Sequence, residues 1–275
     1  MNQGDNMQLI EILKVIIIGI VEGITEWLPI SSTGHMILLD EFIKLNITSE
    51  FKEMFLVFIQ LGAILAVLMV FFNKINPLNK KQEALKDTFK LWLMVIISCL
   101  PAAVIGLLFD DWVYEHFYNS ITVALALIIY GIIFILVERK QKKEKINSLK
   151  VITVKTALLI GLFQLLAIIP GTSRSGATIV GGLLLGMNRS IITEYTFILA
   201  LPVMMGASLL KILKFGFVFT STEIIILVVG MITAFMISFL TVKYLLKYVK
   251  KHDFKIFGWY RIVLGLIIII YFIIK

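Results

Sequence analysis

Three ionisable residues lie inside strongly apolar stretches of the sequence, namely Glu22, Glu26 and Arg174. Such residues are costly in a membrane and usually serve a function there. Glu22 and Glu26 are four residues apart, so on a helix both carboxylates share one face, with roughly 5–6 Å between their Cβ atoms. A shared proton or a divalent cation relieves their repulsion, and oxygen-only ligation favours Mg²⁺ or Ca²⁺ over Zn²⁺. We predict a cation site at Glu22 and Glu26; the alternative for Glu22 is a solvated carboxylate near the membrane surface.

Arg174 lies in a short polar stretch between two apolar ones. Its neighbours are small or carry hydroxyl groups: Thr172, Ser173, Ser175 and Gly176. A planar and permanently charged guanidinium group suits phosphate oxygens, and the amides at the start of the helix that follows would add to an anion site. We predict that Arg174 binds phosphate, and a structural ion pair with Glu26 is compatible with that role.

A histidine and several hydroxyl groups accompany these charges. His35 directly follows the turn that contains Ser31, Ser32 and Thr33, and histidine is the usual general acid or base. The candidate nucleophiles or phosphate ligands are Ser31, Ser32, Thr33, Ser173 and Ser175. Because hydroxyl groups at a helix break often satisfy freed backbone groups, we expect at least two of these five to do only that. The residue types alone do not choose among them.

The elements that must position these residues are membrane helices. Of the residues, 59% are hydrophobic and 16% charged, whereas a soluble domain has about 25% charged residues. The apolar residues form six blocks, each close to the roughly 20 residues that cross a bilayer. We predict an all-α polytopic membrane protein with one membrane domain over residues 1–275. The blocks are Met54–Phe72, Leu91–Phe109, Ile121–Val137, Ile191–Leu213, Ile224–Val242 and Phe257–Ile274.

Two further regions, Leu9–Leu45 and Thr156–Met187, do not fit as spans. Each contains two short apolar arms around a Pro- and Gly-containing break, which predicts a re-entrant helix pair whose broken backbone is buried in protein or lines a wet cavity. The breaks align with one inserted residue, and three spans follow each. An odd number of crossings per half predicts inverted repeats, approximately residues 9–137 and 156–274, with the site between them.

The net charge of +8 reflects lysine-rich loops. Three loops, Asn73–Lys90, Glu138–Lys155 and Lys243–Lys255, hold five, seven and five Lys and Arg residues, whereas Asp110–Asn119 holds none and Lys214–Thr222 one. Under the positive-inside rule the first three loops are cytoplasmic. This pattern favours membrane orientation over nucleic-acid binding and predicts that both chain ends are external. The first re-entrant pair enters from the external side, so we expect the site to open there.

Two motifs resemble those of the bacterial undecaprenyl-diphosphatase (bacitracin-resistance) family. The first is Glu22-Gly-Ile-Thr-Glu26-Trp-Leu-Pro-Ile-Ser31-Ser32-Thr33-Gly34-His35, and the second is Pro170-Gly-Thr-Ser-Arg-Ser-Gly176. The resemblance covers essentially the whole chain. It implies the hydrolysis of undecaprenyl diphosphate, a polyprenyl diphosphate lipid, to undecaprenyl phosphate and phosphate, which recycles the peptidoglycan lipid carrier and confers bacitracin resistance. It also implies a divalent cation and functional roles for the following residues: Glu22, Glu26, Ser32, His35 and Arg174. The sequence is also compatible with a homodimer.

Other classes of protein remain as alternatives. A transporter or flippase for a lipid phosphate or a small anion would also suit inverted repeats with midplane charges, but here the carboxylates and Arg174 come from different repeats, which favours catalysis. Acid-phosphatase-like lipid phosphatases need a later histidine, and none follows Arg174 until His252 in a lysine-rich loop. A purely structural scaffold leaves Glu26 and Arg174 unexplained.

Overall fold

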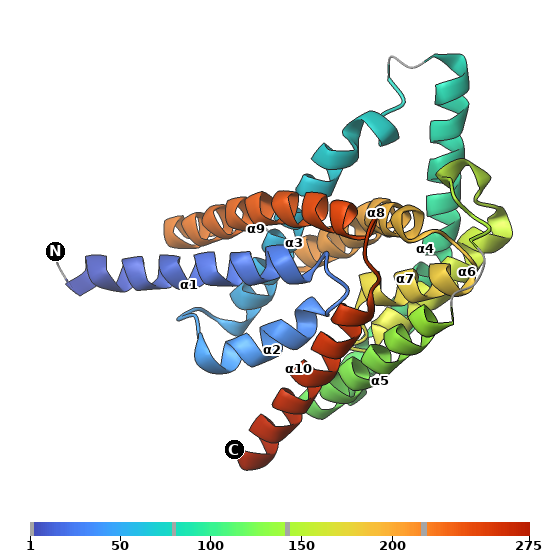
Figure 1. Ribbon diagram of the computed structural model, residues 1–275. Helices are drawn as coiled ribbons and strands as arrows, with labels where there is room; N and C mark the ends of the chain where they lie inside the picture. Colours follow the sequence, from blue (N-terminus) through green and yellow to red (C-terminus); the bar gives the residue numbers. More distant parts are fainter. Residues whose placement is uncertain (1–2, 79–80, 141–143, 216–218) are drawn as a thin grey trace.

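The computed structural model describes residues 3–78, 81–140, 144–215 and 219–275 (Figure 1). These residues form ten α-helices, two short 3₁₀ turns and one isolated parallel bridge between Ile146 and Met187. The helices are α1 Gln3–Thr25, α2 Ser32–Phe42, α3 Ser49–Ile75, α4 Gln82–Phe117, α5 Ser120–Arg139, α6 Val154–Leu165, α7 Arg174–Leu184, α8 Arg189–Phe215, α9 Ser221–Tyr248 and α10 Lys255–Ile274. The 3₁₀ turns are η1 Leu149–Val151 and η2 Leu166–Ile168.

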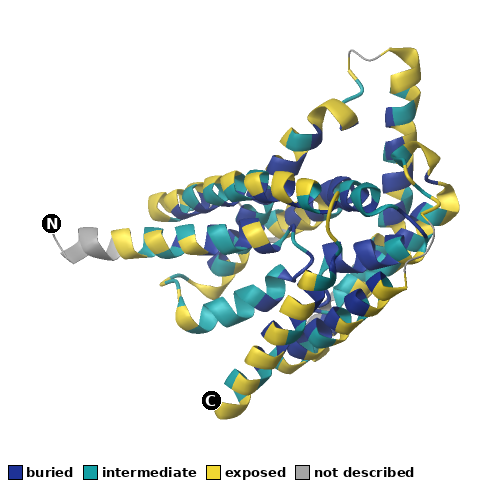
Figure 2. Cartoon of the chain, viewed as in Figure 1, coloured by how far each residue is buried: buried dark blue, intermediate teal, exposed yellow. Residues whose placement is uncertain are grey.

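Six of these helices are long and apolar enough to cross a membrane, and each overlaps one of the six predicted blocks. They are α3, α4, α5, α8, α9 and α10. Many large apolar side chains of these helices are exposed. Figure 2 shows exposed positions in yellow along the helices. In α4 only 22% of the most apolar window is buried inside the protein. An apolar surface of that extent needs lipid around it, which confirms the prediction of a multi-pass membrane protein.

All six spanning helices are longer than their predicted blocks, α4 by the most, and α1 is also longer than expected. α4 continues through the expected loop Asp110–Asn119 as far as Phe117, because no proline or glycine follows Gly106 before the helix ends. Its 36 residues correspond to roughly 54 Å, well beyond the apolar layer. α1 has 23 residues and is therefore longer than the short arm expected. Its charged residues do not interrupt it, since Lys14 pairs with Glu11 one turn earlier at 2.7 Å.

The helices pack in pairs that run between the two halves of the sequence. α1 lies against α9, and α6 lies against α4. α3 contacts both α8 and α9, while α5 and α10 lie side by side (Figure 1). Residues of the breaks between α1 and α2 and between α6 and α7 are buried, among them Trp27, Ser31 and Thr172. The main apolar core is built from α3 to α10 around aromatic side chains such as Trp27, Tyr195 and Phe197.

Close helix packing depends on glycine at a few positions. At Gly62 of α3, a Cβ atom would lie 2.2 Å from the Met231 carbonyl oxygen of α9. At Gly131 of α5, it would lie 2.6 Å from the Gly258 carbonyl oxygen of α10. Both distances are shorter than any ordinary contact, so these helix pairs approach each other over bare backbone, as small residues allow in membrane helices.

Candidate active site

The first break follows α1 and contains Pro29. Proline cannot continue the helical hydrogen bonding, and it pushes the residue before it out of the helical conformation. After the break, Ser31 has φ +72°, and its Oγ accepts a hydrogen bond at 3.4 Å from the Gly34 backbone N–H. Ser31 is therefore the N-cap that starts α2, and this places Ser32 at the first position of the helix.

The second break repeats this geometry. Gly171 has φ +92° and Ser173 φ +71°, and the Ser173 Oγ accepts from the Gly176 N–H at 3.2 Å to cap α7. Among the described residues, Ser31 and Ser173 are the two non-glycine residues in the left-handed region. Such conformations cost free energy and persist where the surroundings enforce them. The first helical position is Ser32 in one break and Arg174 in the other.

Glu26 joins the two breaks. Its Oε2 accepts a hydrogen bond of 2.7 Å from the Ser32 Oγ, and its Oε1 pairs with the Arg174 Nη2 at 3.2 Å. The Glu26 and Arg174 side chains are only 10% and 12% exposed. The predicted convergence of Ser32 and Arg174 is thus present in the structure, because both contact the same carboxylate. The ion pair between Arg174 and Glu26 considered from the sequence is also present.

Two further contacts hold the Arg174 guanidinium in place. Its Nη1 donates to the Thr196 carbonyl oxygen at 3.2 Å. Its central carbon lies 5.8 Å from the ring centroid of Trp27, which is a cation–π distance. The Nε–H has no partner, so the guanidinium is oriented but retains a free donor for an anion.

Glu22 is buried rather than solvated. Its side chain is 2% exposed, and its Oε1 has no hydrogen-bond partner. The Glu26 N–H donates to the Glu22 carbonyl oxygen at 3.0 Å, so the helical turn continues and the two residues are one turn apart. Two hard carboxylate donors with an unpartnered oxygen fit a divalent cation such as Mg²⁺ or Ca²⁺. The solvated alternative for Glu22 is wrong.

His35 is held by groups other than Ser32. Its Nδ1 lies 2.7 Å from the Ser31 carbonyl oxygen, and its Nε2 lies 2.7 Å from the Tyr260 hydroxyl oxygen. A carbonyl oxygen only accepts, so Nδ1 carries the proton and Nε2 accepts from Tyr260 in the neutral ring. The two rings also stack, with centroids 5.6 Å apart. Within this geometry Glu26 is the base in direct reach of Ser32.

Three of the five hydroxyl candidates serve the backbone or each other. Ser31 and Ser173 cap α2 and α7. The Ser175 Oγ lies 3.1 Å from the Ser173 Oγ and 3.5 Å from the carbonyl oxygens of Glu26 and Leu28. This confirms that at least two of the hydroxyl groups satisfy the helix breaks. Ser32 differs, because its hydroxyl donates to a carboxylate.

Arg261 is a site residue that the sequence reading missed. It lies on α10, is fully buried, and donates to the carbonyl oxygens of Pro29 at 3.2 Å, Gly171 at 2.8 Å and Thr172 at 2.7 Å. One side chain therefore ties both breaks together. A signal was available, because Arg261 is an ionisable residue inside an apolar span, the same feature that singled out Arg174.

The buried polar atoms that lack a partner gather around the breaks. Within the part of the chain that the structure describes, they belong to side chains of the two broken segments and of Arg261, which binds both: Glu22, Trp27, Gln164, Thr172, Arg174 and Arg261. Buried polar groups in folded proteins are nearly always hydrogen-bonded. Free donors and acceptors on residues in and next to the two breaks favour a site for a polar ligand or ordered water in this region.

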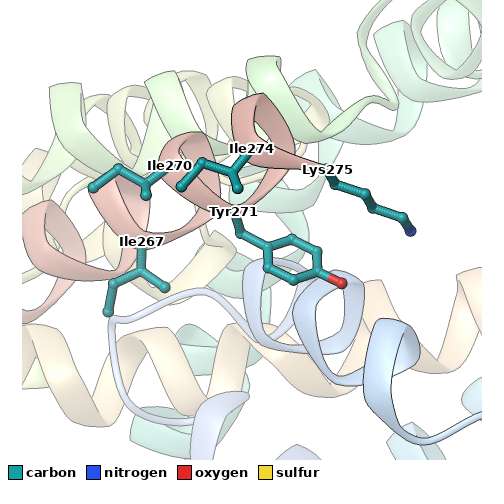
Figure 3. A pocket seen from close by; sticks show the side chains of 5 residues that line it. All are labelled: Ile267, Ile270, Tyr271, Ile274 and Lys275. Carbon is teal, nitrogen blue, oxygen red and sulfur yellow. The ribbon is translucent and has the colours of Figure 1, made fainter.

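Two cavities lie elsewhere. One, of about 460 Å³, is lined by residues at the C-terminal end of α10: Ile267, Ile270, Tyr271, Ile274 and Lys275 (Figure 3). The other, of about 260 Å³, is lined mainly by residues near the end of α5 and the start of α8, including Glu138 and Arg189. Neither of these two cavities is lined by a predicted site residue.

The six apolar helices place this chain among polytopic membrane proteins. Comparison with known proteins makes the assignment specific. The chain belongs to the bacitracin resistance protein BacA family, whose model matches residues 15–267.

Curated relatives resemble the chain over nearly their full length. The undecaprenyl-diphosphatase of Desulfitobacterium hafniense is 59% identical over 271 residues, which cover 97% of this chain and 98% of that protein. An undecaprenyl-diphosphatase of Enterococcus faecalis is 56% identical over 270 residues, covering 96% and 98%. Undecaprenyl-diphosphatase 1 of Clostridium acetobutylicum is 58% identical over 273 residues, covering 98% and 100%. These similarities extend across both breaks and all six spans.

Proposed function

We propose that this chain hydrolyses undecaprenyl diphosphate to undecaprenyl phosphate and inorganic phosphate, which would recycle a lipid carrier of peptidoglycan synthesis and reduce the diphosphate pool that bacitracin binds. The names of its relatives support the substrate. The observation that carries the proposal is the contact of Glu26 with both Ser32 and Arg174, at 2.7 and 3.2 Å. In this proposal Glu26 is the base, Ser32 the nucleophile and Arg174 the group that binds phosphate, and the two contacts of Glu26 support these roles.

The first step of the proposed mechanism uses Ser32 as the nucleophile. Arg174 exchanges its contact with Glu26 for oxygens of the terminal phosphate, a role that suits the guanidinium fork. The Ser32 Oγ attacks the terminal phosphorus while Glu26, 2.7 Å away, accepts the hydroxyl proton. The bond between that phosphorus and the bridging oxygen breaks, and undecaprenyl phosphate leaves. A phosphoserine remains.

In the second step, water attacks the phosphoserine. The bond between phosphorus and the Ser32 Oγ breaks, phosphate leaves, and Glu26 returns its proton to Ser32. We propose that His35 moves the protons of the attacking water. Its Nε2 contacts the Tyr260 hydroxyl at 2.7 Å, and Tyr260 is 45% exposed. Through this contact His35 is linked to a partly exposed hydroxyl group, with which it could exchange protons in the proposed step.

Glu22 and Glu26 are the residues that would hold a divalent cation. When bound, such an ion neutralises negative charge on phosphate oxygens and stabilises the charge that develops in phosphoryl transfer. The free Oε1 of the buried Glu22 supports this assignment. Thr33, Ser173 and Ser175 lie beside Ser32 and Arg174 in the chain, and we assign them to the surroundings of the phosphate.

Helix pairing supports the inverted repeat. Exchanging the halves maps α1, α3, α4 and α5 onto α6, α8, α9 and α10. The contact of α1 with α9 then becomes that of α6 with α4, and both are present. The pairs of α3 with α8 and α5 with α10 map onto themselves. The matched caps at Ser31 and Ser173 support the same relation.

This arrangement underlies the proposed orientation. In Figure 1 the start of α1 lies at the left and the end of α10 at the bottom, whereas the ends of α3 and α5, which lead into lysine-rich segments, lie toward the upper right and the right. We propose that the chain ends and the opening of the site are external, and that the two breaks enter the membrane as re-entrant pairs.

The proposed activity is tested by phosphate release from purified protein in detergent, where transport has no meaning. We expect the wild type to release phosphate from undecaprenyl diphosphate, EDTA to abolish the reaction, and Mg²⁺ or Ca²⁺ to restore it. Release that persists in EDTA would contradict the cation site but not the hydrolase. No release with any cation would contradict the proposed function.

A further inference from the structure

Gln164 near the end of α6, before the second break, corresponds to Glu22 near the end of α1, before the first break. Gly19 and Gly161 each precede a capping serine, Ser31 or Ser173, by twelve residues. In this register Glu22 corresponds to Gln164, each three residues after the glycine and ten residues before the first position of the following helix. The equivalent of Glu26 is Ile168. The second repeat therefore has a polar residue at the position of Glu22 and an apolar residue at the position of Glu26.

Helix packing supports the same correspondence in space. At Gly19, a Cβ atom would lie 3.1 Å from the Gly230 carbonyl oxygen of α9. At Gly161, it would lie 2.5 Å from the Ser98 carbonyl oxygen of α4. The two glycines therefore bring α1 onto α9 and α6 onto α4. Gln164 follows Gly161 by nearly one turn, at the end of α6 where the chain enters the second break.

Gln164 has no partner in the protein. Its side chain is 3% exposed, and neither its Oε1 nor its Nε2 makes a hydrogen bond. Leaving a buried amide unsatisfied destabilises a fold substantially, and an apolar side chain of the same size would remove the problem. Packing alone thus gives no reason for glutamine here. The same pattern, buried and unpartnered, holds for the equivalent Glu22.

We propose that Gln164 is a substrate-binding residue, whose amide donates to a phosphate oxygen of the diphosphate held by Arg174. This inference rests on the proposed function. A neutral amide suits the position, because it supplies N–H donors to an anion without adding negative charge to the two carboxylates already present. Its Oε1 remains able to accept from water or from a protonated phosphate oxygen. Gln164 thereby joins the second repeat to the phosphate site through a residue other than Arg174.

The test compares Gln164→Leu with Ser98→Ala, a matched control from the same α4–α6 contact. Ser98 is also fully buried, but its hydroxyl is satisfied by the Ala157 carbonyl oxygen and the Tyr195 hydroxyl, each at 2.7 Å. We expect Gln164→Leu to raise KM and lower kcat/KM about 10- to 100-fold, the usual loss for a hydrogen bond to a charged group. Its melting temperature in detergent should equal or exceed that of the wild type. Ser98→Ala should melt at a lower temperature and keep its KM.

A second variant and a binding measurement close the test. Gln164→Glu keeps the shape but adds a negative charge, and it should lose more activity than Gln164→Leu. Inorganic pyrophosphate should raise the melting temperature of the wild type and leave that of Gln164→Leu unchanged. A wild-type KM in Gln164→Leu, or an equal pyrophosphate shift in both proteins, would overturn the proposal. The change in melting temperature with pyrophosphate tests the role of Gln164 even if the wild type releases no phosphate. Absence of phosphate release would contradict only the proposed function.

Discussion

At the scale of single residues, the centre of the site is Glu26, because each of its carboxylate oxygens has a different partner. One accepts from Ser32 and the other from Arg174. In this low-dielectric surrounding an isolated charge would be strongly unfavourable. The two partners therefore stabilise the charged carboxylate and also hold it where a substrate can displace one of them.

Replacing Ser32 by alanine distinguishes covalent catalysis from direct attack by water. If Ser32 is the nucleophile, kcat should fall by roughly 10⁴-fold or more, as it does when a nucleophilic serine is removed elsewhere. Single-turnover assays with labelled substrate should then find a phosphoenzyme in the wild type and none in Ser32→Ala. Near-normal turnover by the variant would instead make Ser32 a phosphate ligand and water the nucleophile.

Replacing Arg174 by alanine removes the predicted phosphate clamp. We expect a loss of about 100- to 1000-fold in kcat, the usual effect of deleting one preorganised donor to a developing charge. Arg174→Lys keeps the charge but not the planar fork, so it should recover only part of this loss. The control is Arg139→Ala, since Arg139 is an exposed arginine at the end of α5. Equal activity of Arg174→Ala and Arg139→Ala would contradict the role.

At the scale of helices, the structure depends on close contacts between spans. Gly62→Ala should destabilise the protein by about 1–3 kcal/mol, the usual effect of overpacking, because its Cβ would lie 2.2 Å from the Met231 carbonyl oxygen. Gly206→Ala is the matched control on α8, where a Cβ would meet nothing within 4 Å. Thermal melting in detergent should separate the two variants. If they melt together at the wild-type temperature, the close approach of α3 and α9 is not required.

The sequence predicted the helices better than it predicted their ends. Hydropathy located all six spans because a bilayer requires long apolar helices. It did not predict the extension of α4 to Phe117, since polar residues continue a helix as readily as they form a loop when no breaker intervenes. The presence of ionisable residues inside apolar stretches singled out Glu22, Glu26 and Arg174. The contact of His35 with Tyr260 joins residues 225 positions apart, and local patterns carry no information about such a contact.

At the scale of the whole molecule, the charge pattern predicts one orientation. Single cysteines can be placed at the exposed positions Glu115 and Lys145 in a Cys99→Ala background. A membrane-impermeant maleimide added to intact cells should label the variant Glu115→Cys and not Lys145→Cys. After lysis both should react. Labelling of Lys145→Cys from outside would reverse the proposed topology and, with it, the external opening of the site.

Arg261 has a consequence for how the protein can diverge. Its three hydrogen bonds end on main-chain carbonyl oxygens of Pro29, Gly171 and Thr172, and every amino acid supplies such an oxygen. The hydrogen bonds of Arg261 to the two breaks therefore do not depend on which side chains the accepting residues carry. A side-chain change at Thr172 would leave the bond to its backbone oxygen in place. Only the side chain of Arg261 on α10 is required for these hydrogen bonds, and it lies far along the sequence from the first motif that it holds in place.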